Sequence, residues 1–135
     1  MTRVPSAASA LWTVERANRA LPLVRRIVDD LVRAHAEWRD LVERYALACA
    51  ANSLVRPDPQ AARLQMAAER VAKDVDEFMR ELAELGVECK SIESGLVDFP
   101  AERDGRTVYL CWRAGEPSVT HWHEFDAGFG GRQPL

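Results

Sequence analysis

Apolar residues recur at seven-residue intervals in two long stretches of the chain, and neither stretch contains an internal glycine. The repeating positions are Val24, Leu31, Trp38 and Tyr45 in the first stretch and Leu64, Val71, Phe78 and Leu85 in the second. Further small or apolar residues lie between them, so each stripe is wider than a minimal two-position seam. Such a stripe predicts an amphipathic helix that needs a partner helix.

Two prolines and a glycine predict where these helices begin and end. Pro22 disfavours helical geometry at the residue before it, which predicts a short first helix over residues 13–21 with Thr13 as its N-cap. Pro22 then begins a long helix over residues 22–51.

The second long helix is predicted over residues 59–85. Asp58 is its N-cap, Pro59 its first residue and Gly86 its left-handed C-cap. Residues 52–59 are too few to form more than a loop, so the two long helices should fold back on each other as an antiparallel hairpin.

After Gly86 the pattern changes to short extended runs rich in strand-forming residues. The runs lie at residues 87–92, 95–99, 107–113 and 119–125. The dipeptide Asp104-Gly105 is typical of a two-residue hairpin turn, and Pro100 should end the second run. We therefore expect an antiparallel β-meander over residues 87–125 and an irregular glycine-rich tail over residues 126–135. The predicted class is α+β, mainly α.

Length, composition and charge narrow the classes of function. The chain of 135 residues suits one domain, and 47% hydrophobic with 29% charged residues is typical of a folded protein. A net charge of −3 gives no overall attraction to nucleic acid or an anionic membrane. Three widely spaced cysteines without a CxxC motif fit a reducing cytoplasm. No apolar run is long enough to span a bilayer, and residues 1–10 do not resemble a signal peptide.

The residues from His121 to Asp126 contain the sharpest candidate for chemistry. On a strand, alternate residues share a face, so His121 and His123 point the same way. Two imidazoles on one face, with Asp126 nearby, are a candidate site for zinc or iron. No cofactor is firmly predicted, because an HxH pair without a defined third ligand is weak evidence.

Cys111 is the strongest candidate for a third ligand, and the register of two strands decides the question. If Arg113 pairs with Ser118, then Cys111 faces Thr120. A slip of one residue instead places Cys111 opposite His121. Activation of Cys111 as a nucleophile by a histidine is a further alternative, although a cysteine in an apolar strand is more often inert.

Other polar and aromatic residues of the C-terminal third complete the candidate set. Asp98 is an alternative to Asp126 as the carboxylate that orients His123, and Glu116 is a second candidate for acid–base work. Arg132 would hold an anion in the glycine-rich tail. Trp112 and Trp122 are expected to pack over the helices, with docking of a partner protein as the alternative.

Several groups of residues resemble a known family over nearly the whole chain. At the N-terminus they are Trp12-Thr13-Val14-Glu15, Ala17-Asn18 and Leu21-Pro22-Leu23. In the C-terminal third they are Gly95-Leu96-Val97-Asp98-Phe99-Pro100, Leu110-Cys111-Trp112 with Gly115-Glu116, and Trp122-His123 with Asp126, Gly128-Phe129 and Arg132. Together they resemble the bacterial domain-of-unknown-function family 2203.

The resemblance implies a soluble bacterial protein and assigns no activity and no catalytic residue. Some members of the family carry a label that connects them to cell division. The family pattern more often has an aromatic residue at position 121, so His121 departs from it. The resemblance therefore favours His123, with Trp122, Asp126 and Arg132, for any shared role.

The leading hypothesis is a non-enzymatic protein that docks a partner protein or self-associates, most simply as a homodimer, through its long helices. One partner helix buries only one seam, so the wide stripe needs a further surface. The alternative is a small metal-binding protein or metal-dependent enzyme with its site around His123.

Overall fold

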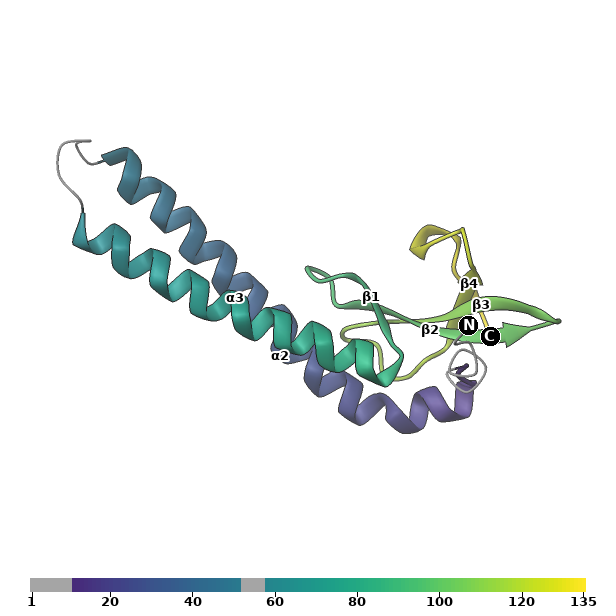
Figure 1. The fold of residues 1–135 in the computed structure, drawn as a ribbon. Helices are drawn as coiled ribbons and strands as arrows, with labels where there is room; N and C mark the ends of the chain where they lie inside the picture. Colours follow the sequence, from purple (N-terminus) through teal and green to yellow (C-terminus); the bar gives the residue numbers. More distant parts are fainter. Residues whose placement is uncertain (1–10, 52–57) are drawn as a thin grey trace, which may run out of the picture.

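The computed structural model describes residues 11–51 and 58–135. Within them, two long helices lie side by side, and a five-stranded sheet packs on one end of the pair (Figure 1). The helices are α2 (Val14–Ala51) and α3 (Pro59–Leu85); the strands are β1 (Glu88–Ser91), β2 (Leu96–Arg103), β3 (Arg106–Arg113), β4 (His121–Glu124) and β5 (Gln133–Pro134), with a short 3-10 helix η1 (Phe129–Gly131) before β5. The predicted α+β fold, mainly α and built on a helical hairpin, is confirmed.

The predicted capping residues hold the helix ends. Asp58 accepts a hydrogen bond from the backbone N–H of Gln60 at 3.1 Å and Pro59 follows it. Gly86 ends α3 in the left-handed conformation, at φ 84°. Thr13 accepts from the backbone N–H of Arg16 at 3.1 Å. The loop predicted before Asp58 falls on residues 52–57, which lie outside the described part of the chain.

Pro22 lies inside α2, so the predicted short helix over residues 13–21 with a separate helix over 22–51 is wrong. Proline removes one helical hydrogen bond and commonly bends a helix, and α2 changes direction in its N-terminal part (Figure 1). The helix nevertheless continues because Leu21 and Val24 are only 3% and 0% exposed and belong to the same core cluster. Burial of the flanking residues outweighs the local preference for a break.

The sheet is a meander in which every strand pairs antiparallel with the next, in the order β1-β2-β3-β4-β5. Alternate residues of its central strands face the helices and are buried there: Val97, Phe99, Ala101, Val108, Leu110, Trp112 and Trp122. They pack with Val24, Val28 and Leu31 of α2 in one cluster. Trp112 and Trp122 therefore lie in the core, as expected from the sequence.

Strand β2 runs through Pro100 instead of ending there, which corrects the predicted boundary. In a strand, the N–H and C=O of one residue point to the same side, and the carbonyl of Pro100 accepts from the N–H of Trp12 at 2.7 Å. The backbone N–H that Pro100 lacks would therefore point past the end of β1, whose pairing with β2 stops at Asp98. No ladder bond to β3 is lost. The Asp104-Gly105 turn that follows has φ 53° and 77°, as a two-residue hairpin requires.

The C-terminal tail is ordered into η1 and β5, which differs from the irregular tail predicted for residues 126–135. Strand β5 pairs with β4, placing His121 opposite Pro134 and Trp122 opposite Gln133. The glycines that suggested an irregular segment are used at turns, with Gly128 at φ 71°.

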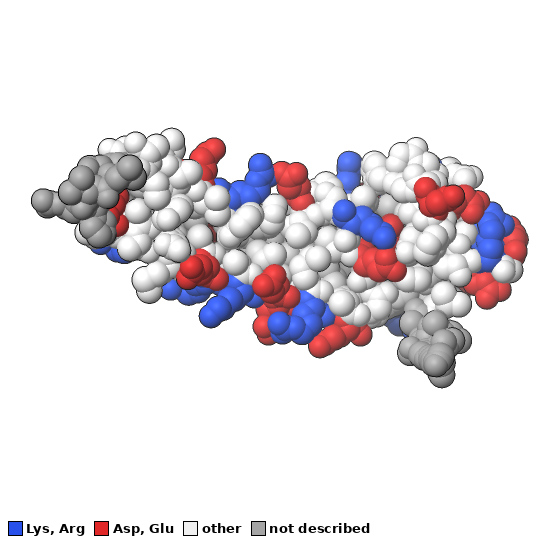
Figure 2. Space-filling model, turned by 45° about the horizontal axis from the view of Figure 1, so that its top comes forward, with Lys and Arg blue, Asp and Glu red and all other residues white. Residues whose placement is uncertain are grey.

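The half of the hairpin remote from the sheet has a thin core. It contains four buried residues, Leu41, Leu64, Ala68 and Val71, each 7–8% exposed. Leu47 and Met66 are 65% and 64% exposed. On the face shown in Figure 2, uncharged side chains dominate this end of the hairpin, while acidic and basic residues alternate along its middle. Among the described residues, no helix is both long and apolar enough to cross a membrane.

Candidate metal centre

The face of the sheet that points away from the helices holds a small buried polar cluster. Asp98 on β2 pairs with Cys111 on β3, and Tyr109, two residues before Cys111, pairs with His123 on β4. Because directly opposite residues in antiparallel strands share a face, these side chains all lie on this outer face. Asp98, Cys111 and His123 are 1%, 0% and 2% exposed. Three polar side chains from three strands thus meet out of contact with solvent.

Both ring nitrogens of His123 make hydrogen bonds. Nδ1 lies 2.8 Å from the carbonyl oxygen of Glu124, and Nε2 lies 2.9 Å from Oδ2 of Asp98. A carbonyl oxygen only accepts, so Nδ1 carries a hydrogen. The contact between Nε2 and Oδ2 then needs a second proton, placed on either the imidazole or the carboxyl group. The His123–Asp98 pair therefore shares one proton and is neutral overall in either form.

The second carboxyl oxygen of Asp98, Oδ1, is buried and has no hydrogen-bond partner among the described residues. Burial raises the pKa of Asp98 above its ordinary value, and the neighbouring His123 opposes that rise. A buried acceptor without a donor is costly, commonly about 1–3 kcal/mol. Such an atom calls for an explanation such as a water molecule or an ion.

Cys111 completes a set of three side chains that suits a metal ion. One ligand atom of each of Asp98, Cys111 and His123 lies within 4.8 Å of the other two. Burial, and secondarily the charge of Asp98, raise the pKa of the Cys111 thiol to about 12. The thiol is therefore protonated and poorly nucleophilic at neutral pH, which argues against the alternative of cysteine catalysis. A bound cation would reverse this, because metal coordination deprotonates a thiol.

Tyr109 forms one wall of the cluster, and the sequence pattern did not single it out. Its ring lies 5.4 Å from the ring of His123 and stacks on Phe125 at 5.1 Å. Its hydroxyl donates to the Glu88 carboxylate at 3.0 Å, and the Lys90 ammonium lies 4.7 Å above its ring. The strand register that pairs Tyr109 with His123 would have revealed this contact, but the register was not determined by the sequence.

Glu116 and Arg132 form an ion pair beside the cluster. Two nitrogens of the Arg132 guanidinium donate to the two Glu116 carboxylate oxygens at 2.8 and 3.0 Å. This hydrogen bonding is the main cause that lowers the pKa of Glu116. The backbone of Glu116 is also held in place, since its carbonyl accepts from the Trp112 indole N–H at 2.9 Å. The Nε atom of Arg132 is buried and has no partner among the described residues.

The structure brings together a different set of ligands from the predicted His121, His123 and Asp126. His123 is the member common to both sets. Asp126 is exposed in the turn after β4, so it does not join the cluster. His121 lies opposite Cys111, which is the second of the two registers considered, but its Nδ1 contacts the Thr120 hydroxyl at 2.9 Å. Of the two carboxylates weighed as the partner of His123, Asp98 is the one in contact.

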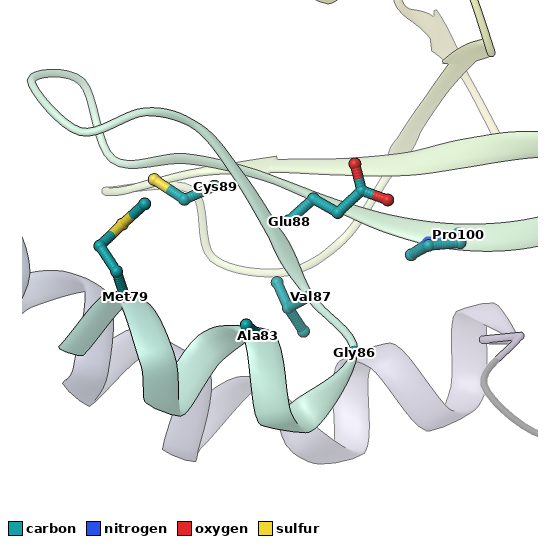
Figure 3. A pocket seen from close by; sticks show the side chains of 7 residues that line it. All are labelled: Met79, Ala83, Gly86, Val87, Glu88, Cys89 and Pro100. Atoms are coloured by element: carbon teal, nitrogen blue, oxygen red, sulfur yellow. The ribbon is translucent and has the colours of Figure 1, made fainter. Parts of the chain in front are cut away.

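A separate groove of about 490 Å³ lies between the end of α3 and β1, and Figure 3 shows the side chains that line it. Its walls are mostly apolar, with Met79 and Cys89 at one end and Val87 and Pro100 farther along. The Glu88 carboxylate points away from α3 (Figure 3), and it accepts a hydrogen bond from the Tyr109 hydroxyl at 3.0 Å. No set of converging polar groups marks this groove as a site of chemistry.

Comparison with known proteins agrees with the resemblance seen in the sequence. Residues 10–135 match the model of the family described as "Uncharacterized conserved protein (DUF2203)". The chain belongs to this family. No curated protein and no solved structure matches it.

Proposed function

We propose that this member of the DUF2203 family is a non-enzymatic protein that binds one divalent transition-metal ion, zinc or ferrous iron, between Asp98, Cys111 and His123. The Oδ1 atom of Asp98 carries the proposal, because it is a buried acceptor with no hydrogen-bond partner among the described residues. A cation is the ligand that would satisfy both this oxygen and the neighbouring thiol. A thiolate, an imidazole and a carboxylate are a donor set that zinc and iron accept.

The hydrogen bond from Nδ1 of His123 to the Glu124 carbonyl supports the same reading. A histidine that binds a metal typically donates its other ring N–H to a carboxylate or backbone carbonyl, which fixes the orientation of the ring. Here that bond leaves Nε2 directed at Asp98, toward the centre of the cluster.

Charge balance also favours a divalent ion. Asp98 as a carboxylate and Cys111 as a thiolate together carry two negative charges, which cancel those of the ion. The nearby positive charge of Arg132 is already matched by Glu116, at 2.8 Å. The loaded site would therefore be neutral, which a buried site requires.

Burial favours a structural ion over a catalytic one. Three protein ligands leave the fourth position of the ion to water, as in catalytic sites, but the three side chains are at most 2% exposed, which keeps a substrate away from that position. An ion held here would connect β2, β3 and β4. The three free cysteines, one of them the exposed Cys49, support the cytoplasmic location proposed from the sequence.

Metal content of purified protein tests the proposal. The protein is stripped with a chelator, reloaded under anaerobic conditions with Zn²⁺ or Fe²⁺, and analysed by elemental analysis. We expect one equivalent of metal in the wild type and none in His123→Ala or Cys111→Ser. The matched control is His121→Ala, which removes an imidazole from the same strand and face but outside the cluster, and should still bind one equivalent. Wild-type protein that retains no metal after reloading would refute the proposal.

A separate observation favours a second function, self-association through the end of the hairpin remote from the sheet. Near the sheet, the full width of the apolar stripe on α2 packs in the core, whereas among the described residues the far half of the stripe packs on α3. Residues 45–51 contain no charged side chain, and Leu47 and Met66 are exposed there. A second copy laid against this end would bury apolar surface without charge repulsion.

Sedimentation analysis over a concentration series tests self-association. We expect a dimer in the wild type and a monomer for Leu47→Glu. Leu23→Glu is the control, since Leu23 is also exposed, at 41%, but lies near the sheet end of α2. A wild-type monomer at millimolar concentration would exclude this second function.

A further inference from the structure

The C-terminal strap, defined as residues 128–135, runs beside β4, to which its residues Gln133 and Pro134 are paired as β5. In Figure 1 the first part of this yellow segment stands above the sheet, both helices lie below the sheet, and the chain returns beside β4 to its C-terminus. Arg132 connects the strap to the cluster, because one of its guanidinium nitrogens lies 3.5 Å from the carbonyl oxygen of Cys111. The ring of Tyr109 packs against the ring of His123 in the cluster.

The strap is attached by the two-residue pairing of β5 with β4 and by a small number of further contacts. Its only described ion pair is the one from Arg132 to Glu116. The Phe129 ring lies between the guanidinium groups of Arg132 and Arg113, 4.6 and 5.4 Å away. At the end of the strap, the backbone N–H of Leu135 donates to the carbonyl of Thr120 at 2.9 Å. A segment held this way opens at a lower free energy than a packed core strand.

Burial separates the strap from the cluster. No residue from 128 to 135 is buried, whereas Asp98, Cys111 and His123 are. Gly128 at the start of the strap has φ 71° and no atom within 4 Å of the place where a Cβ would stand. A glycine in this conformation with free space around it suits a hinge.

We propose that the C-terminal strap gates the metal site, with the Arg132–Glu116 ion pair as its latch. This inference rests on the proposed metal binding and adds its regulation. A hydrated ion reaches the buried ligands when the latch opens and the strap swings away about Gly128. The strap then closes over the loaded site, so the latch sets the rates of loading and release and leaves the equilibrium affinity nearly unchanged.

The rate of metal loading tests the gate. Metal-free protein is mixed with Zn²⁺, and uptake is followed by competition with a chromophoric chelator. Glu116→Gln removes the charge that holds Arg132, and we expect loading and release both to accelerate about three- to fivefold, as loss of one partly exposed ion pair allows.

The matched control is Arg106→Gln. It breaks another two-pronged ion pair of the sheet, in which Arg106 donates to Glu124 at 3.0 and 2.6 Å and which does not involve the strap. This control should load at the wild-type rate. Equal rates for all three proteins would overturn the gate, and so would an acceleration in Glu116→Gln that merely follows an equal loss of global stability in urea unfolding.

A second measurement does not depend on metal, so it separates failure of the gate from failure of the metal site. In a Cys49→Ser, Cys89→Ser background, alkylation of the remaining Cys111 in metal-free protein reports opening of the strap. We expect Glu116→Gln to be labelled faster by the same three- to fivefold factor, and Arg106→Gln not to be. If the wild type binds no metal but labelling still follows the latch, the metal proposal fails while the strap remains a gate over Cys111; unchanged labelling would overturn the gate.

Discussion

Both faces of the β-sheet contain fully buried residues, but these residues are covered by very different parts of the chain. On the inner face, Phe99 and Trp112 are 0% exposed beneath the two long helices. On the outer face, Cys111 is also 0% exposed, yet its neighbours there are Tyr109 and Arg132 of the C-terminal strap. Alternate residues of the same strands thus enter two different environments.

The difference separates stability from chemistry. Apolar side chains against helices gain free energy in proportion to the area removed from water. Polar side chains under a thin cover gain little from burial and must satisfy one another, which His123 and Asp98 do only in part because Oδ1 of Asp98 lacks a partner. The protein already has an apolar core on the inner face. A buried polar face that lowers the stability of the fold is therefore where a binding function is expected.

Removing a large side chain from the inner face should have the largest effect on stability. Phe99→Ala deletes a ring that meets Trp12 edge-on at 5.1 Å and leaves a cavity beneath the helices, so we expect a loss of about 3–5 kcal/mol in the free energy of unfolding. The matched variant is Phe125→Ala on the outer side, where the ring is 61% exposed. Urea unfolding should show a loss several times smaller for this variant. Similar losses for the two variants would remove the distinction between the faces.

Breaking the buried polar pair should have the next largest effect. His123→Ala leaves Asp98 without its one neutralising partner in a buried site, and we expect about 3 kcal/mol of destabilisation in metal-free protein. A double-mutant cycle with Asp98→Ala separates the pair from its surroundings and should give a coupling of about 1–3 kcal/mol. Additive losses would mean that the contact of 2.9 Å contributes nothing specific.

Metal binding should release the proton of the Cys111 thiol. This proton is present at neutral pH because burial raises the pKa of Cys111 to about 12. Calorimetry in buffers of different ionisation enthalpy measures the number of protons released, and loss of this proton alone should raise the affinity about tenfold for each unit of pH near neutrality. In Cys111→Ser the thiol is absent, so its proton is no longer released, and most of the affinity for the metal ion is lost. Binding without proton release would place the ion elsewhere.

Most of the fold could be predicted from local signals. The seven-residue apolar repeats located both long helices, and Asp58, Gly86 and Asp104-Gly105 marked a helix start, a helix end and a hairpin turn. The failures at Pro22 and Pro100 share one cause. Each proline lacks a backbone N–H donor, and in each case the surrounding structure offsets that loss. For Pro22, the burial of Leu21 and Val24 outweighs the lost helical hydrogen bond. For Pro100, the missing N–H would lie past the end of β1, so no ladder bond is lost. Only the tertiary structure contains this information.

The site was predicted less completely, because it depends on how strands pair. His123, Asp98 and Cys111 were each candidates, but the sequence favoured Asp126 and His121 as companions of His123. A shift of one residue in the pairing of β3 and β4 would exchange the neighbours of Cys111, and the observed pairing joins Cys111 with His121. The diagonal contact from His123 to Asp98 spans two strand interfaces. Nothing in the local sequence specifies such a contact.

The latch of the strap should give the smallest effect, and it is visible through pH. The Arg132 hydrogen bonds lower the pKa of Glu116 below the ordinary glutamate value. Because the folded-state pKa is depressed, the stabilisation is fully present above the ordinary glutamate pKa and is lost as the pH falls through the lower folded value. For a pair that is 14% and 22% exposed, we expect at most about 1 kcal/mol.

A carbon-detected NMR titration of the Glu116 carboxyl group measures this effect directly. The midpoint should lie below that of an ordinary glutamate in the wild type and move back up in Arg132→Ala. The protection of the Leu135 amide, whose N–H bonds to Thr120, should fall over the same acidic range in the wild type when exchange is compared with its intrinsic rate at each pH. In Glu116→Gln this protection should be low at every pH, since a neutral glutamine cannot titrate. If the Leu135 amide stays protected below the Glu116 midpoint, the strap is fixed as firmly as the helices that cover the inner face. The two faces would then differ only in the residues they contain.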